Sequence, residues 1–600
     1  AGVVFAAPKL YSGFLHFAFS RMFPWAVVLV LAALRDHTCA STDTFLSTAA
    51  KQPPSLSAER ALLQRLEEVL GSSHRQRTES LLGVLSSALE PTVVSLPKNP
   101  RGAMSKASAR YALHRVFVQR HGWVLNGAAP DGGSWAPTST VLGVGTYLPR
   151  VVRELFETHL DDSDGYTLEG VALLAAAIEA LVHAEVYVRL NATYAVLDKD
   201  VDRALSQEDA SHVIDVYLQT ILLGLQITKL SREEVVEATK DFTYMFPYWE
   251  EIKGLVPEAQ REVASGLQSF AFMDITRILQ RISERLGARL EETNCQEMRD
   301  HLFQAEEHNG TGRVRLRDFY ASAVDGSAWQ FQESIDYLRQ MGMLDESDVS
   351  QPRVIIANYL YMHADCIDGS YFYQYCCANP CEDLMSKLEQ GIQAPYATPD
   401  EIIGLVLATP ARSTPANRSL APALVRKLED VADHHGGVVP LHGRLFAQWM
   451  HFAYPHECPY PHLSGTTKLS VSLEEEAELK LSWSESEMRS YVESSPDVPK
   501  AIGCDMQDPE QDSCPITAMW VHEEELVDAA AWNATVASRE LSRQPTPFRV
   551  SFGIRTCLLF TFLLSFAASM HNLIVHGLSS MGVVAGKAGG GETKVGVLSV

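Results

Sequence analysis

The most informative part of the sequence is Leu197-Asp-Lys-Asp-Val-Asp-Arg-Ala-Leu-Ser-Gln-Glu-Asp209. Counted from Asp198, oxygen-bearing groups stand at positions 1, 3, 5, 7, 9 and 12. Calcium takes six to eight hard oxygen ligands around one point, and this spacing lets a single short loop supply most of them. The sequence therefore predicts a calcium site whose ligands are Asp198, Asp200, Asp202, the carbonyl of Ala204, Ser206 through a water molecule, and Asp209.

Apolar residues flank this loop at helical spacing. Leu190 and Tyr194 precede it, and Tyr217 and Ile221 follow it. That spacing is typical of amphipathic helices. A helix, an acidic loop and a second helix form the EF-hand unit, and the stretch resembles an EF-hand loop of degenerate type. The resemblance implies calcium as the cofactor.

Two positions depart from the EF-hand pattern. Position 6, where the pattern has glycine because the chain takes a positive φ, is Arg203, so we expect backbone strain there. Position 12 is Asp209 rather than glutamate, which makes a bidentate contact harder. The alternative interpretation is an acidic helix-capping loop on a solvated surface.

EF-hands normally pair, and residues 161–172 are the expected partner of the first loop. Asp162, Asp164 and Gly165 stand there in the expected order, but no carboxylate occupies the last ligand position. We expect this loop to brace the first one without holding a metal well.

A third candidate loop covers residues 307–318. Val314 fills its position 8 and Asp318 its position 12, but three arginines crowd it with positive charge, which predicts poor calcium affinity. The stretch from Asp345 to Asp348 follows it and is the candidate for its vestigial mate.

Composition bounds the class of protein. The chain has 600 residues, 46% hydrophobic and 21% charged, which suits several folded domains. Its formal net charge is −24, and no cluster of lysine and arginine appears, so nucleic acid is excluded as a partner. The helical spacing of the apolar residues predicts a mainly α fold.

Two apolar stretches predict membrane targeting. Residues 22–34 form a short apolar core that follows the basic Arg21 and precedes the small residues Thr38-Cys-Ala40, which is the layout of a secretory signal peptide. Residues 556–575 are about long enough to cross a bilayer as a C-terminal transmembrane helix, although a buried core helix is the alternative. We expect a single-pass protein of the secretory pathway or cell-surface membrane, which attaches through this helix and has an unknown protein partner.

The cysteines agree with a lumenal or extracellular body. Eight lie between the two apolar stretches, and an even number in a secretory chain predicts disulfide bonds: Cys295, Cys366, Cys376, Cys377, Cys381, Cys458, Cys504 and Cys514. A metal site formed by Cys376, Cys377 and Cys381 with His363 and Asp365 is the alternative. Glycosylation sequons, which predict a glycoprotein, begin at Asn191, Asn309, Asn417 and Asn533.

Changes in composition and motif content along the sequence divide the chain into eight parts. In order, we expect a leader and signal peptide (1–40), a mobile lead-in and docking segment (41–144), an EF-hand-like pair (145–230), a helical region with a degenerate EF-like loop (231–325), a Cys-rich helical module (326–468), an acidic linker and membrane-proximal region (469–555), a transmembrane helix (556–575) and a short tail (576–600).

Four motifs stand out within residues 325–470: Phe331-Gln-Glu-Ser-Ile-Asp-Tyr-Leu-Arg339, Tyr375-Cys-Cys-Ala-Asn-Pro-Cys-Glu-Asp-Leu384, His434-His-Gly-Gly437 and Val439-Pro-Leu-His-Gly-Arg-Leu-Phe-Ala-Gln-Trp-Met-His451. Through these motifs the region resembles a family of uncharacterised secreted or membrane proteins of dinoflagellates and related algae. This resemblance implies no activity.

Together these patterns predict a membrane-anchored, calcium-binding structural or interaction protein. One alternative is a secretory-pathway enzyme that uses the His-rich 434–462 region, with candidate residues His363, Asp365, His434, His435, His451, His456 and His462. Zinc held by His451, His456, His462 and Cys458 lacks the closely paired ligands that zinc enzymes place on one helix. The other alternative is a structural surface protein with non-functional EF-hands.

Overall fold

The structure is a computed structural model that describes residues 72–125, 165–306, 310–324, 331–361, 366–370, 372–412, 418–467, 480–495, 519–543 and 563–572. Within these ranges the fold is mainly helical, as the sequence predicts, and every strand is two or three residues long.

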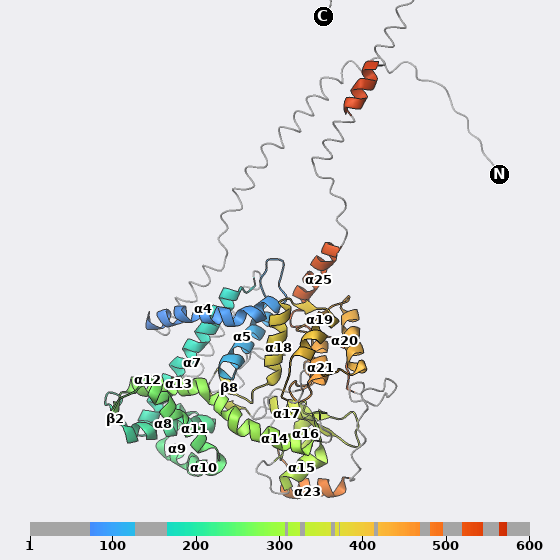
Figure 1. Ribbon diagram of the computed structural model, residues 1–600. Coiled ribbons are helices and arrows are strands. Elements are labelled where there is room, and N and C mark those ends of the chain that lie inside the picture. The colour runs from blue at the N-terminus through green and yellow to red at the C-terminus, as the bar shows by residue number, and fades with distance from the viewer. Residues whose placement is uncertain are drawn as a thin grey trace, which may run out of the picture. The chain divides into compact units, whose positions relative to one another are not determined.

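Long helices at the start of the described chain form a layer. These are α4 (Ser72–Ser95), α5 (Lys106–His121) and α7 (Leu168–Val196). Helix α4 packs against α7 and against the later helix α18 (Pro380–Ile392), so segments far apart in sequence lie side by side (Figure 1). Helix α7 is apolar around its whole circumference because it is buried on nearly all sides.

The described chain contains three similar pairs of helix–strand–helix units, and the 198–209 loop belongs to the first pair. One unit is α7, β2 (Leu205–Ser206) and α8 (Gln207–Leu222), and the other is α12 (Leu255–Val263), β3 (Ser269–Phe270) and α13 (Phe272–Leu290). The two strands run antiparallel with Leu205 opposite Phe270. Between the units lie η1 (Ile227–Lys229), α9 (Arg232–Ala238), α10 (Phe242–Met245) and α11 (Trp249–Lys253). We call α7–β2–α8 with α12–β3–α13 the first pair.

The second pair follows a π-helical turn, η2 (Glu291–Cys295). Its units are α14 (Gln296–Ala305), β4 (Arg313–Arg315) and α15 (Leu316–Val324), then α16 (Ile335–Gln340), β6 (Arg353–Ile355) and α17 (Ile356–Tyr361). Val314 lies opposite Val354, and β5 (Leu344–Asp345) adds a third strand on the other edge of β6. Strand β6 thus lies between β4 and β5, and Arg313 of β4 forms an ion pair with Asp345 of β5 at 2.7 Å.

The third pair occupies part of the Cys-rich stretch, where the sequence predicts helices but no such repeat. It consists of α18, β9 (Tyr396–Ala397) and α19 (Pro399–Ala408), then α20 (Pro422–His434), β10 (Val439–Pro440) and α21 (Arg444–Ala453). Ala397 lies opposite Val439. The helix–loop–helix repeat therefore extends well beyond the loops with acidic sequence.

The three pairs share one register. In five of the six units the residue at the centre of the strand pairing stands two positions before the following helix begins; α21 is the exception and begins later. In four units the third residue of that helix is an acid: Asp209, Asp274, Asp318 and Glu401. An acid at this position accepts hydrogen bonds from the start of the helix and favours its dipole.

Each pair has its own buried core. The largest cluster surrounds α7 and α13, a second fills the second pair, and a third fills the third pair around Trp449. A small sheet, with strand order β1 (Trp123–Leu125), β8 (Tyr373–Tyr375) and β7 (Ile367–Asp368), ties the N-terminal layer to the later chain. Trp123 stacks on Tyr373 with their ring centroids 4.2 Å apart.

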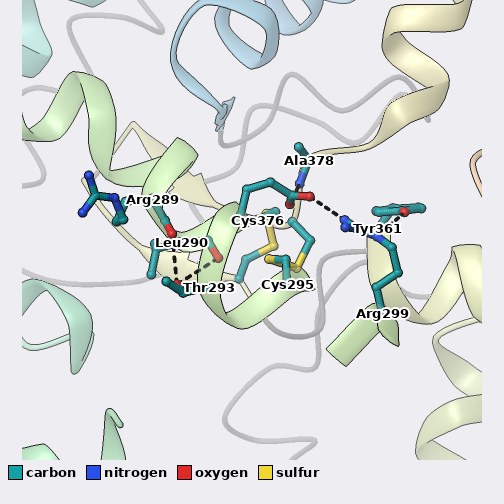
Figure 2. The surroundings of a disulfide bond; sticks show 11 residues. Arg289, Leu290, Thr293, Cys295, Arg299, Tyr361, Cys376 and Ala378 are labelled. Carbon is teal, nitrogen blue, oxygen red and sulfur yellow. Dashed lines mark hydrogen bonds and ion pairs between the residues drawn. A yellow bond between two sulfur atoms is a disulfide. The ribbon is translucent and has the colours of Figure 1, made fainter. Parts of the chain in front are cut away.

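Disulfide bonds confirm the interpretation of the cysteines as far as the described residues reach. They join Cys295 to Cys377, Cys366 to Cys376, and Cys381 to Cys458. The adjacent cysteines 376 and 377 thus belong to two different bonds, which lie together beside the π-helical turn (Figure 2). Cys504 and Cys514 lie outside the described residues.

The predicted C-terminal transmembrane helix is not shown. Of residues 556–575 the structure describes 563–572, which are helical and exposed. Among the described residues the single helix long and apolar enough to cross a membrane is α7, and 83% of its most apolar part is buried, as in a core helix. Residues as far as Trp532 form one compact unit and residues from Asn533 a second; α23 (Glu485–Ser494) lies in the first, and α25 (Ala529–Arg543) spans the division. The predicted signal peptide at residues 22–34 lies outside the described residues.

Candidate functional site

The loop at residues 198–209 lies between α7 and α8, where the sequence places it. Asp198, Asp200 and Asp202 are exposed, and the Asp200 carboxylate accepts a hydrogen bond from the Asp202 amide at 3.0 Å. Leu205 is buried and anchors the end of the loop against Phe270. The loop thus has a fixed apolar end and a solvated acidic end.

Asp209 serves the start of helix α8. Ser206 is the N-cap residue, and its hydroxyl accepts a hydrogen bond from the Asp209 amide at 3.1 Å. The same hydroxyl donates to the Asp209 carboxylate at 3.1 Å. Ser206 and Asp209, the predicted ligands at positions 9 and 12, therefore already satisfy each other.

A lysine side chain competes for the same carboxylate. Lys199 Nζ lies 2.6 Å from Asp209 Oδ1. The hydrogen bond from Lys199, followed by the one from Ser206, lowers the pKa of Asp209. The sequence analysis does not predict this ion pair. A lysine directly after the first predicted ligand is the feature of the sequence that could have indicated it. Calcium would have to displace the ammonium group from Asp209.

The loop's backbone departs from the expected EF-hand conformation. Among the described residues other than glycine, positive φ occurs at Asp198 (54°) and Gln393 (52°), and Arg203 does not take it. The expectation of strain at Arg203 is therefore wrong. The left-handed residue is the first predicted ligand, a residue type that tolerates this conformation better than most.

The predicted ligands are not gathered around one point. Among the described residues, one group of three or more His, Cys, Asp or Glu residues has ligand atoms all within 4.8 Å of one another, namely Glu291, Cys295 and Cys377. Cys295 and Cys377 are joined in a disulfide, so they offer no thiolate to a metal. Carboxylates of the 198–209 loop would have to move together to hold an ion.

The expectation that residues 161–172 form the partner loop is wrong. In the described chain β2 pairs with β3, so the partner of the 198–209 loop is the segment before α13 and not residues 161–172. Of the latter, Asp162 and Asp164 lie outside the described residues, while Tyr166 bridges to Met104 and Thr167 caps α7. The true partner has the same sequence signal as the first loop, an apolar residue at position 8 and an acid at position 12, but it lacks the earlier carboxylates.

The 307–318 loop is organised by a carboxylate just outside it. Residues 307–309 lie outside the described chain, and Gly312 takes a φ of +68°, as a glycine at position 6 should. The buried Glu306 carboxylate accepts hydrogen bonds from the amides of Gly310 and Gly312 and from the Thr311 hydroxyl. His456 Nε2 lies 3.0 Å from the same carboxylate. Burial alone would raise the pKa of Glu306, but these hydrogen bonds, with His456 foremost, outweigh it and lower the pKa.

Arginines of this loop form ion pairs with acidic side chains. Arg313 is buried and pairs with Asp345 at 2.7 Å, whereas Arg315 pairs with Asp318 at 2.7 Å. The position-12 carboxylate is therefore neutralised within its own unit. This geometry agrees with the poor calcium affinity that the sequence predicts for the loop.

The buried histidines of the alternative enzyme site that the structure describes have different hydrogen-bond partners. His451 bonds to Arg313 and the Cys458 carbonyl, His456 bonds to Glu306, and His462 bonds to the Gly342 carbonyl. Of the pair 434–435, His435 bonds to Glu524 at 2.8 Å and His434 is exposed. Burial, then the positive charge of Arg313, lowers the pKa of His451 to about 3, so this ring is neutral at physiological pH.

Both cysteine-containing metal alternatives are wrong. Cys458 forms a disulfide with Cys381, which removes it from a zinc site with the nearby histidines. Cys376 and Cys377 are likewise disulfide-bonded, and His363 and Asp365 lie outside the described residues.

No protein-family model, curated protein or solved structure matches the chain. The resemblance of residues 325–470 to an algal family stays a prediction.

Proposed function

We propose that this protein is a calcium-binding structural or interaction protein, and that its calcium site is the 198–209 loop. The observation that carries the proposal is the register of β2 and β3. It places a buried apolar residue at position 8, a paired strand beside it and a helix from position 10, around a loop with carboxylates at positions 1, 3, 5 and 12. This arrangement supports our proposal of a paired EF-hand.

The remaining loops supply a scaffold. The partner segment 263–274 carries no acid before Asp274, and the position-12 acid of the second pair, Asp318, is occupied by Arg315. We therefore propose one calcium ion per chain, held by one loop and braced by the others. In a compartment with millimolar calcium, an affinity of roughly 10⁻⁴–10⁻³ M fills such a site.

The place of action follows from the cysteines. Disulfides persist in oxidising compartments, so the three bonds support a lumenal or extracellular body. We propose that residues 22–34 direct the chain there and that residues 556–575 anchor it. A stop codon after Phe548 should release a soluble, secreted protein, whereas the full chain should resist carbonate extraction. Equal solubility of the two forms would contradict the anchor.

Calorimetric calcium titration of the full chain tests the site. The parent protein should release or absorb heat in the millimolar range, and Asp198→Ala should abolish it. Asp318→Ala is the matched control because it removes an acid at position 12 of an arginine-occupied loop, and it should leave the titration unchanged. The absence of heat from the parent protein would contradict the calcium proposal.

One observation favours a second candidate, a structural protein without a calcium site. Lys199 forms an ion pair with Asp209, the predicted ligand at position 12. If Lys199→Met binds calcium and the parent protein does not, the loop is an EF-hand that its own lysine has inactivated.

A further inference from the structure

The second pair is covered by a segment from much later in the chain. Helix α23 packs against α15 (Figure 1). In the sequence the whole third pair lies between these two helices. We call residues 480–495, which comprise α23 and the short stretch before it, the docked segment.

The start of the docked segment is held by backbone hydrogen bonds. The Trp483 amide donates to the Gln332 carbonyl at 2.6 Å, and the Leu481 carbonyl accepts from the Ser334 amide at 2.8 Å. These bonds flank an antiparallel bridge between the two stretches of chain. Proteins bind extended peptides through main-chain bonds of this kind.

Three side chains anchor the rest of the docked segment. Met488 is 3% exposed and belongs to the core of the second pair. Trp483 stacks on Tyr320 of α15 with their ring centroids 5.0 Å apart, and Tyr491 meets the same ring edge-on at 5.6 Å. An amphipathic helix laid on an apolar surface is a second common mode of peptide recognition.

This attachment is shallow compared with the packing of the second pair itself. Met488 is the single buried residue of the ten in α23, and Glu485 and Arg489 are exposed on the same helix. An isolated helix of this length is marginal in water. Elements with few buried apolar contacts open at a lower free energy than the core does. The docked segment should therefore detach while the second pair stays folded.

We propose that the surface of the second pair beneath the docked segment is a peptide-docking site, which the chain's own residues 480–495 occupy. The site takes a short extended stretch followed by an amphipathic helix. A partner peptide with Trp, Met and Tyr at the spacing of Trp483, Met488 and Tyr491 displaces the docked segment. This surface does not involve the 198–209 loop, so the proposal stands apart from the calcium site.

Fluorescence anisotropy with a labelled peptide of residues 480–495 tests the site in the full chain. Met488→Asp places a charge where Met488 is buried, so it should release the tethered segment and open the site. This variant should bind the peptide at least about tenfold more tightly than the parent chain, in which the tethered segment competes at high effective concentration. Ser490→Asp is the matched control, because Ser490 is exposed on the same helix, and it should behave as the parent chain does.

Changes in the peptide test the anchors. A peptide with Met488→Asp should bind the opened chain at least about tenfold more weakly than the unchanged peptide, because it loses the burial of one Met side chain. A peptide with Ser490→Asp should bind within about twofold of the unchanged one. No binding of the unchanged peptide to a folded Met488→Asp chain, or equal binding of the unchanged and Met488→Asp peptides, would overturn the proposal.

Hydrogen exchange of the parent chain decides the matter even where Met488→Asp fails to fold, which thermal unfolding would reveal. The amides of α23 should exchange at least about 100-fold faster than those of α14 and α15, because the docked segment opens without the pair beneath it. Equal protection of α23, α14 and α15 would show that the segment is an integral part of the second pair and would overturn the proposal.

Discussion

The 198–209 loop and the 307–318 loop occupy equivalent places in the first and second pairs, yet they are held in different ways. In the second pair a buried carboxylate, Glu306, gathers the amides of Gly310 and Gly312 and meets His456. In the first pair the three early aspartates are exposed, and the Asp200 carboxylate accepts a hydrogen bond from the Asp202 amide. The comparison shows that protein groups organise one such loop internally, while the other leaves the carboxylates of Asp198, Asp200 and Asp202 exposed to solvent.

The largest expected effect concerns the buried ion pair of the second pair. Arg313→Met should destabilise the protein by about 3–5 kcal/mol, because it leaves the Asp345 carboxylate buried without its partner. Arg203→Met, in the exposed part of the first loop, should change stability by less than about 0.5 kcal/mol. Urea unfolding of both variants measures the difference, and equal effects would break the contrast between the loops.

Acid should weaken the second loop through Glu306. Because folding lowers the pKa of this carboxyl, its contribution is present above the unfolded value of about 4.3 and is lost as the pH falls through the folded pKa. Stability of the parent protein should therefore decrease between about pH 5 and pH 3. Glu306→Gln should be less stable at pH 7 and should show a shallower decrease. The same slope in both proteins would mean that Glu306 is not the titrating group.

The neutral state of His451 provides a direct spectroscopic check. With its pKa near 3, its imidazole carbon resonance should not shift in NMR spectra between pH 7 and pH 5. A His451 shift near pH 6 would contradict the packing of Arg313 against this ring.

Sequence predicts the helices on both sides of the 198–209 loop because Leu190, Tyr194 and Tyr217 repeat at helical spacing. It also predicts the disulfide-bonded cysteines, because an even number of cysteines after a predicted signal peptide is informative. It does not predict the partner of β2, since two-residue strands carry almost no local signal and Leu205 meets Phe270 only through the tertiary fold.

The candidate site was predictable in its residue types and not in its geometry. Spacing alone identifies the carboxylates, but the ion pair between Lys199 and Asp209 and the positive φ of Asp198 depend on how the loop packs. The buried histidines illustrate the same limit. His451 and His456 lie close together in sequence and suggest one site, but the fold gives each a separate partner.

The smallest expected effect is a change in calcium affinity when Lys199 is replaced. Lys199→Met removes the ammonium group that competes for Asp209, so it should tighten calcium binding by about two- to fivefold, in keeping with the modest strength of exposed ion pairs. Lys240→Met is the matched control, because Lys240 is an exposed lysine with a weak neighbouring pair and lies outside the loop. Unchanged affinity in Lys199→Met would show that Asp209 is not a ligand.

Equilibrium dialysis with radioactive calcium tests the central claim most directly, because it counts the ions that each full-length chain holds at millimolar concentration. One ion per parent chain, none in Asp198→Ala and one in Asp318→Ala is the result that we predict. No bound calcium in the parent chain, or one ion retained in Asp198→Ala, would contradict the assignment of the 198–209 loop.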